Sequence, residues 1–322
     1  MLRFLSRRRL GIGALLVAVV AAQGPAEAAW PDKPVRLIVP FEPGGTSDQI
    51  ARVFQRALDE QNLLGQPLTV INVGGHWSVG ARQVKDGPAD GYNFLIVHPA
   101  IMGGEASGAV DFGYRDFEPV ASTSESCTLA VVADGSPFKT LDDLMNAAKE
   151  KPDTIVFGVN IGGNNHLAAL LLQQAAPGAA FRFTQIGGGA ATFKNLVGGH
   201  TEAGILGRPE YASFKDNGIR PLAYLAAERH PKLADIPTAK ELGYDAEFCP
   251  SNWWLAPKGT PQEAIDGLAA ALEKAMATTL VQEEMEKRMY EPIFLKGEAL
   301  ASSLDAAWVR IEPIGKLAAP RK

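Results

Sequence analysis

The sequence is poor in cysteine and histidine, which restricts the chemistry it can carry out. Among its 322 residues there are 2 cysteines and 5 histidines, and the histidines are scattered singly. No Cys-x-x-Cys pair, His-Glu-x-x-His pair or Gly-x-Ser-x-Gly turn occurs, so the common metal and nucleophile motifs are missing. The candidate catalytic groups are Ser47, Asp48, His76, His166 and Glu42. We expect a protein without catalytic activity, metal or cofactor.

Long apolar runs are missing beyond the N-terminus, and so is an excess of positive charge. No segment after residue 30 is apolar over the roughly 20 residues that span a bilayer. The formal net charge is −5, and it becomes −8 without residues 1–28, which hold four basic residues and one acidic one. This acidic balance argues against a nucleic-acid partner, and it means that local dipoles would have to hold an anionic ligand.

The first thirty residues have the order of a secretory signal peptide. Four arginines within residues 3–9 precede an apolar run over residues 10–22, and an Ala-x-Ala cleavage site lies at residues 26–28. The apolar run is too short to cross a bilayer comfortably. We therefore predict that residues 1–28 are removed and that the mature chain is periplasmic. The stretch over residues 6–10 is also compatible with twin-arginine export.

Short β-branched segments alternate with helical patterns over nearly the whole mature chain, which is typical of the α/β class. The predicted strands cover residues 35–41, 68–73, 93–98, 128–133, 154–159, 181–186, 220–225 and 253–256. The predicted helices cover residues 50–58, 140–152, 167–174, 191–197, 261–276 and 281–289. The mature length of roughly 290 residues favours two domains. Because no proline- or serine-rich linker divides the chain, two domains would have to exchange strands.

Two loops share one construction, in which a strand, a Gly-Gly turn and a polar cap lead into a helix. They run from Pro43 to Asp48 and from Ile161 to His166, and a third glycine-rich turn runs from Gln185 to Ala190. Glycines let the backbone approach a ligand, and the free N–H groups of a first helical turn attract an anion. Neither of the first two loops fits a phosphate-loop or dinucleotide fingerprint. They indicate an anion site, although each loop alone is also typical of an ordinary strand-to-helix turn.

Cys127 and Cys249 leave two interpretations open. Export to an oxidising compartment would permit a disulfide between them. Two isolated cysteines are equally typical of small apolar side chains in a core. The residues alone do not decide between these alternatives.

At the glycine loops the sequence resembles the solute receptors of tripartite tricarboxylate transporters, the TctC or Bug-type family. The resemblance covers nearly the whole mature chain and lies in the order of several motifs. They read WPDKPVRLIVPFEPGGTSDQIAR, DGYNFLIV, GGNNHLAALLL, IGGGAATFKNLVGGH, RPLAYLAAERHPKLADIPTAKELGYD and WWLAPKGTP. Each motif is modest evidence, but their order and spacing together are highly specific.

The resemblance implies a bilobed periplasmic binding protein of type II-like architecture, with two α/β lobes joined by crossing strands. One lobe would comprise residues 29–127 and 251–322, and the other residues 128–250. The resemblance places the crossings near Cys127 and Cys249, which would bring the two cysteines close together. It also implies a monomer that closes on a small carboxylate and delivers it to membrane permease subunits.

The resemblance places a ligand carboxylate between the first two glycine loops. It places the distal end of the ligand at the third turn and at the segment from Leu206 to Arg208. The expected ligand contacts are Phe41, Pro43, Gly44, Gly45, Thr46, Ser47, Asp48, His76, Trp77, His98, Ile161, Gly162, Gly163, Asn164, Asn165, His166, Gln185, Gly187, Gly188, Ala190 and Arg208.

The chain departs from the family pattern at positions that bear on ligand identity. His76 and Trp77 stand where small residues are common, and Gln185 replaces a frequent tyrosine. No carboxylate stands at Leu206, where the family often has one, and Arg208 follows two positions later. A cation would suit a second anionic group, and Trp77 could stack on a planar ligand or pack in the core. We expect a dicarboxylate, tricarboxylate or aromatic carboxylate.

Two other functions use the same sequence features. A receptor that presents its closed form to a membrane sensor kinase would need the same cleft and the same closure. A periplasmic enzyme acting on a carboxylate is the remoter alternative, because the candidate catalytic groups form no known motif.

Overall fold

The computed structural model describes residues 30–318, and two β-sheets organise this part of the chain. The predicted signal peptide over residues 1–28 lies outside the described residues. The first sheet has the order β11 (Glu291–Leu295), β4 (Phe117–Glu125), β10 (Ser251–Pro257), β3 (Asn93–Val97), β1 (Val35–Val39) and β2 (Leu68–Asn72). The second has the order β7 (Arg182–Gln185), β6 (Val156–Val159), β8 (Ala203–Gly207), β5 (Thr128–Ala133) and β9 (Ile219–Leu225).

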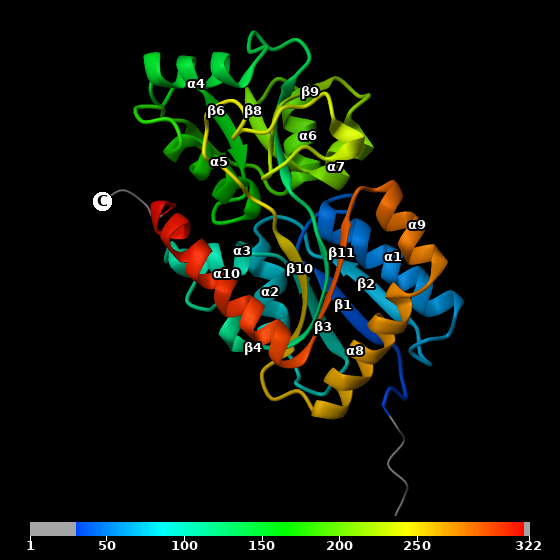
Figure 1. Ribbon diagram of the computed structural model, residues 1–322. Coiled ribbons are helices and arrows are strands. Elements are labelled where there is room, and N and C mark those ends of the chain that lie inside the picture. Colours follow the sequence, from blue (N-terminus) through cyan, green and yellow to red (C-terminus); the bar gives the residue numbers. More distant parts are fainter. Residues whose placement is uncertain (1–29, 319–322) are drawn as a thin grey trace, which may run out of the picture.

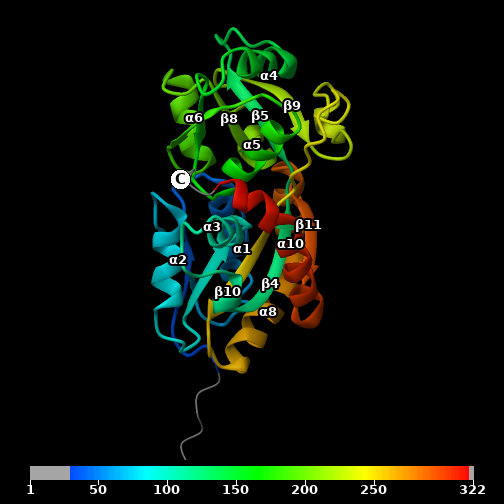
Figure 2. The same ribbon diagram turned by 90° about the vertical axis from the view of Figure 1, so that its left-hand side faces the viewer.

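Helices cover both sheets, so that each forms an α/β lobe (Figure 1). The helices of the first lobe are α1 (Thr46–Glu60), α2 (Trp77–Lys85), α3 (Ala100–Ala106), α8 (Gln262–Met276), α9 (Thr279–Lys287) and α10 (Gly297–Leu317). Those of the second lobe are α4 (Leu141–Glu150), α5 (Asn164–Gln174), α6 (Gly189–Val197) and α7 (Arg208–Phe214). Figure 2 shows the second lobe above the first, with α5 facing the side of the first lobe that carries α3. The α/β class and the bilobed architecture are therefore confirmed.

Both sheets mix parallel and antiparallel pairs in a way that follows from the chain path. In the first sheet β1 pairs in parallel with β2 and β3, whereas β10 pairs antiparallel with β3 and β4. In the second sheet β6 pairs in parallel with β7 and β8, whereas β5 is antiparallel to β8 and β9. The parallel strands therefore direct their carboxyl ends, and the glycine loops that follow them, toward the other lobe.

Local sequence explains where several helices begin and which face they bury. Ile50, Phe54 and Leu58 recur at helical spacing on α1, and all three are buried. Thr140 caps α4, because its hydroxyl accepts the N–H of Asp143. The hydroxyl of Thr260 donates to the carbonyl of Pro257, and α8 begins at Gln262, one residue after the predicted start.

The chain crosses between the sheets twice, and the two crossings lie side by side. The first crossing leads from β4 into β5, and the second leads from β9 back into β10. The N–H of Ser126 donates to the carbonyl of Pro250, and the N–H of Thr128 donates to the carbonyl of Phe248, both at 3.1 Å. A disulfide joins Cys127 to Cys249 at this point. The crossings thus form a short double connection that is pinned covalently.

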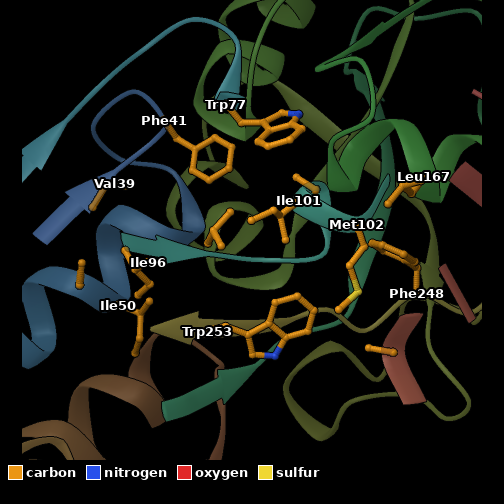
Figure 3. Close-up of a cluster of buried hydrophobic side chains, with 14 of the residues drawn as sticks. Val39, Phe41, Ile50, Trp77, Ile96, Ile101, Met102, Leu167, Phe248 and Trp253 are labelled. Carbon is orange, nitrogen blue, oxygen red and sulfur yellow. The ribbon is translucent and has the colours of Figure 1, made fainter. Parts of the chain in front are cut away.

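One apolar cluster extends from the first sheet into the second lobe. Figure 3 shows Ile101 and Met102 of α3 with Trp77 above them and Trp253 below. Leu167 of α5 belongs to the same cluster, and all five side chains are buried. The lobes therefore share apolar packing on the side where α3 meets α5. Within residues 30–318, no helix combines the length and apolar character that a bilayer crossing requires.

Candidate functional site

A narrow cavity of about 50 Å³ lies between the two lobes, enough for a few water molecules. Its wall combines the ends of the parallel strands with the crossing segments. The lining residues are Phe41, Glu42, Gly45, Thr46, Ser47, His98, Ser126, Thr128, Asn160, Gly163, Asn164, Asn165, Gly188, Gly189, Ala190, Ile205, Gly207, Glu210, Pro250 and Asn252. Ten of the expected contacts lie in this wall, among them members of all three glycine loops. This cavity is therefore the candidate ligand-binding site.

Four helix N-termini meet at this cavity, and each has a glycine as its N-cap. Gly45 precedes α1, Gly163 precedes α5, Gly188 precedes α6 and Gly207 precedes α7, and a glycine has no side chain with which to cap its own helix. A helix N-terminus carries a partial positive charge and N–H groups without partners in the helix. No acceptor in the described part of the chain pairs with the N–H groups of Asn164 and Asn165. The helix ends therefore place backbone donors and partial positive charge at the wall.

The first glycine loop is held from behind by Asp48, which does not line the cavity. Its Oδ2 accepts the N–H of Gly44 at 2.8 Å, and its Oδ1 accepts from the side chains of Arg52 and Asn72. Gly44 has φ +90°, a conformation that favours glycine. Pro43 and Gly44 also lie outside the wall. Asp48 thus shapes the loop that presents Thr46 and Ser47 to the cavity.

The second glycine loop rests on helix α3 of the first lobe. Gly162 has φ +73°, and a Cβ at Gly103 would lie 2.5 Å from the Gly162 carbonyl oxygen. His166 does not line the cavity, because its Nδ1 accepts the N–H of Gly162 at 3.1 Å and its ring packs on Phe183. Burial lowers the pKa of His166 to about 4, so the ring is neutral at pH 7. Backbone contact therefore fixes this loop against the first lobe.

The amide of Asn160 has an orientation that its neighbours determine. The backbone N–H of Ile161 donates to Gln185 Oε1 at 2.7 Å, which identifies Gln185 Nε2 as the donor end of that side chain. Gln185 Nε2 then donates to Asn160 Oδ1 at 3.1 Å. Asn160 Nδ2 is therefore a donor, and it has no hydrogen-bond partner among residues 30–318. Because a buried donor without a partner is costly, this amide favours a ligand acceptor in the cavity.

The third glycine turn is tied to the second loop by Asn165. Its Nδ2 donates to the carbonyl of Gly187 at 3.0 Å, and its Oδ1 accepts the N–H of Asn160 at 2.9 Å. Asn165 therefore connects the two loops of the second lobe while its own N–H lies in the first turn of α5. Gly188 and Ala190 line the cavity, whereas Gly187 lies behind it.

Among residues 30–318, two carboxylates and no lysine or arginine lie in the wall. Glu210 Oε1 accepts the N–H of Thr46 at 2.8 Å, and Oε2 accepts the N–H of Gly207 at 2.8 Å. Glu42 Oε1 accepts the N–H of Gly75 at 2.9 Å. Burial lowers the pKa of His98 to about 3, so this residue adds no positive charge at pH 7. The groups in this wall that can attract an anion are therefore backbone N–H groups and the Asn160 amide.

Several expected contacts pack elsewhere, Trp77 and Arg208 among them. Trp77 is fully buried against Gly104 and Phe112, which is a packing role. Arg208 is 2% exposed; its guanidinium donates to the Tyr224 hydroxyl and pairs with Glu291 of the first lobe at 3.0 Å. The expected contacts outside the wall are Pro43, Gly44, Asp48, His76, Trp77, Ile161, Gly162, His166, Gln185, Gly187 and Arg208.

His76 lies between the two lobes, although outside the cavity wall. Its Nε2 lies 3.1 Å from the carbonyl oxygen of Ile161, and its Nδ1 lies 2.7 Å from the Ser78 hydroxyl. Trp77 Nε1 donates to the same Ile161 carbonyl at 3.4 Å. These two residues therefore contribute to the contact between α2 and the second glycine loop.

Sequence reasoning missed eight of the residues in the wall. They are Glu42, Ser126, Thr128, Asn160, Ile205, Glu210, Pro250 and Asn252, of which Glu42 was considered only as a catalytic group. Gly189 and Gly207 lie in segments that were expected at the ligand. Asn252 shows why residues were missed, because strand β10 brings it to the wall beside Ser47, whose hydroxyl donates to its Oδ1 at 2.8 Å across 205 positions. The pattern Gly207-Arg208-Pro209-Glu210, a helix start with proline and a capping glutamate, was the available signal for Glu210.

Comparisons with known proteins point to one family. The model of the tripartite tricarboxylate transporter family receptor matches residues 50–314. The protein BugT of Bordetella pertussis is 30% identical over 89% of this chain and 90% of its own. A Rhodopseudomonas palustris protein solved with adipate is 28% identical, with a TM-score of 0.81 over 90% of this chain and 98% of its own. MatC of the same organism, solved with malate, shares the fold at 23% identity and a TM-score of 0.80, over 89% of this chain and 100% of its own.

Proposed function

Because this chain belongs to the tripartite tricarboxylate transporter receptor family, we propose that it binds a small carboxylate in the interlobe cavity. The bound carboxylate is then delivered to membrane permease subunits of a tripartite transporter. Removal of residues 1–28 during export makes the receptor a periplasmic monomer. In this proposal residues 29–127 and 251–322 form one lobe, residues 128–250 form the other, and binding closes them on the ligand.

The observation that carries this proposal is the group of donors without partners at the second glycine loop. The first-turn N–H groups of α5 at Asn164 and Asn165 have no acceptor in the described chain, and Asn160 Nδ2 has none either. A hydrogen bond to a charged group contributes about 1.5–3 kcal/mol, and a helix N-terminus adds about 0.3–1 kcal/mol. A carboxylate at this position would satisfy all three donors at once, which a neutral acceptor with one oxygen could not do.

The similarity to the receptor solved with adipate supports the ligand class. That protein is 28% identical over 90% of this chain, so the proposal of a carboxylate ligand agrees with what a relative binds.

Thermal-shift measurements with paired ligands test the proposal. Each small carboxylate is compared with its primary amide, which keeps the carbon skeleton but lacks the charge. We expect a concentration-dependent rise in Tm with at least one carboxylate and none with its amide. Equal stabilisation by the amides, or by uncharged or cationic compounds alone, would contradict the proposal.

The Asn160→Ala variant locates the ligand in this cavity. Loss of one charge-assisted hydrogen bond, about 1.4 kcal/mol, predicts an affinity about tenfold weaker in calorimetric titration. Asn146→Ala is the matched control, because Asn146 is exposed on α4. An unchanged affinity in Asn160→Ala would place the ligand elsewhere.

A further inference from the structure

Glu210 places a carboxylate at the positions where a ligand anion would otherwise find donors. Its side chain is buried, with 5% of the residue exposed, and it extends from α7 of the second lobe to α1 of the first. One oxygen accepts the N–H of Thr46 in the first turn of α1, and the other accepts the N–H of Gly207. The N-terminus of α1 is therefore already paired with an anion that belongs to the protein.

The Glu210 carboxylate occupies space that is free because two neighbouring residues are glycines. A Cβ at Gly189, the first residue of α6, would overlap the Glu210 carboxyl group, and a Cβ at Gly207 would lie 3.3 Å from Glu210 Oε2. The Glu210 carboxylate thus lies beside the N-terminal ends of α1, α6 and α7. Burial raises the pKa of Glu210, but both oxygens accept N–H bonds, which favours the ionised form.

The remaining charges of the wall restrict which charged groups a ligand can have. Glu42 adds a second carboxylate, within 3.5 Å of where a Cβ on Gly187 would lie, and its Oε1 accepts the N–H of Gly75. Among residues 30–318, no lysine or arginine lines the cavity, and His98 is neutral at pH 7. The first turn of α5 and Asn160 Nδ2 offer donors without partners in the same wall. The cavity therefore offers donors for one ligand carboxylate, together with two carboxylate acceptors of the protein.

From this arrangement we infer that the ligand is a small monocarboxylate whose other end carries a hydroxyl or ammonium donor, and that Glu210 selects it. The inference rests on the proposed function and narrows it, because a second ligand carboxylate would share this narrow cavity with the Glu210 carboxylate. Like charges at short range in a site of low dielectric repel strongly. The donor of the ligand instead forms a charge-assisted hydrogen bond with Glu210.

Matched ligand series test this inference by calorimetric titration. For chains of three to five carbons, the dicarboxylate is compared with the ω-hydroxy and ω-amino acids of the same length, for example succinate with 4-hydroxybutyrate and 4-aminobutyrate. We expect the tightest ω-hydroxy or ω-amino acid to bind at least tenfold more tightly than the dicarboxylate of equal length. A dicarboxylate that binds as tightly or more tightly overturns the inference, while the proposed function stands. Failure of every carboxylate to bind overturns both.

The variant Glu210→Gln tests whether this side chain causes the selectivity against dicarboxylates. It keeps the size of the group and removes the charge, so we expect the ratio of dicarboxylate to ω-substituted affinity to rise at least tenfold. A ratio of two affinities in one protein is insensitive to a general loss of stability. Glu228→Gln is the matched control, because Glu228 is an exposed residue of the second lobe, and it should leave the ratio unchanged. An unchanged ratio in Glu210→Gln contradicts the role of Glu210, and the wild-type ratio remains a test if this variant fails to fold.

Discussion

Replacing Gly103 by alanine tests how the two lobes meet. A Cβ at this position would lie 2.5 Å from the Gly162 carbonyl oxygen and 2.9 Å from Leu167 Cδ1, both of which belong to the second lobe. Gly162 has φ +73° and lies against Gly104, so the loop has little freedom to yield. The added methyl group therefore crowds the lobe arrangement of this structure, and we expect that opening, by separating α3 from this loop, relieves the crowding.

The contacts of Gly103 give the expected loss of closed population and of ligand affinity. Overpacking by one methyl group costs about 1–3 kcal/mol, and this cost falls on the closed state alone. Alanine in the interior of α3 would favour the helix by about 0.5–1 kcal/mol in both the open and the closed state. The closed population should fall about 5- to 150-fold relative to the open one, and the apparent ligand affinity should fall by up to that factor.

Two measurements read out this change. Calorimetric titration with the carboxylate that most stabilises the wild type should show the weaker affinity, and small-angle scattering should show a larger radius of gyration. Gly135→Ala is the control, because a Cβ at Gly135 meets no atom within 4 Å. Wild-type affinity and dimensions in Gly103→Ala would refute the reasoning.

Two further predictions concern stability. Replacing Cys127 and Cys249 together by serine should lower the free energy of unfolding in urea by about 2–5 kcal/mol, because the disulfide closes a loop of 122 positions; a loss below about 1 kcal/mol would contradict this. Burial lowers the pKa of His166 to about 4, so below pH 6.5 the unfolded chain binds a proton that the folded protein does not. Stability should therefore fall as the pH drops from 6.5 toward 4, by up to about 1.4 kcal/mol per pH unit for this histidine. His166→Gln should flatten the decline, and an unaltered decline would count against the neutral ring.

The elements that sequence patterns predicted are those whose partners lie nearby in the chain. The apolar stripe of α1 and the capping Thr140 of α4 carry their signals within a few residues, and both helices are present. Strand β4 was not predicted, because Pro119 and a run of serine and threonine make its sequence resemble a loop. Its pairing with β10, more than 100 positions away, makes it a strand. Strands β8 and β11 and helix α10 were missed as well.

In the site, too, features encoded by neighbouring residues were predicted, whereas contacts between distant segments were not. The glycine loops were predicted from the turns and helix starts that local sequence encodes, and they meet at the cavity. Arg208 was expected at the ligand, but Tyr224 and Glu291 hold its guanidinium away from the wall. Glu210 looks locally like an ordinary capping residue, and its contact with Thr46 spans 164 positions. Contacts of this kind depend on how the lobes close, which local patterns do not encode.

Affinity selection with mass spectrometry tests the central claim most directly. The purified receptor is incubated with an equimolar mixture of small carboxylates, amines and neutral compounds, and the retained molecules are identified after gel filtration. A carboxylate held in the interlobe cavity predicts that every specifically retained compound carries a carboxylate, and that Asn160→Ala retains less of each. Specific retention of compounds without a carboxylate, at wild-type levels in Asn160→Ala, would contradict it.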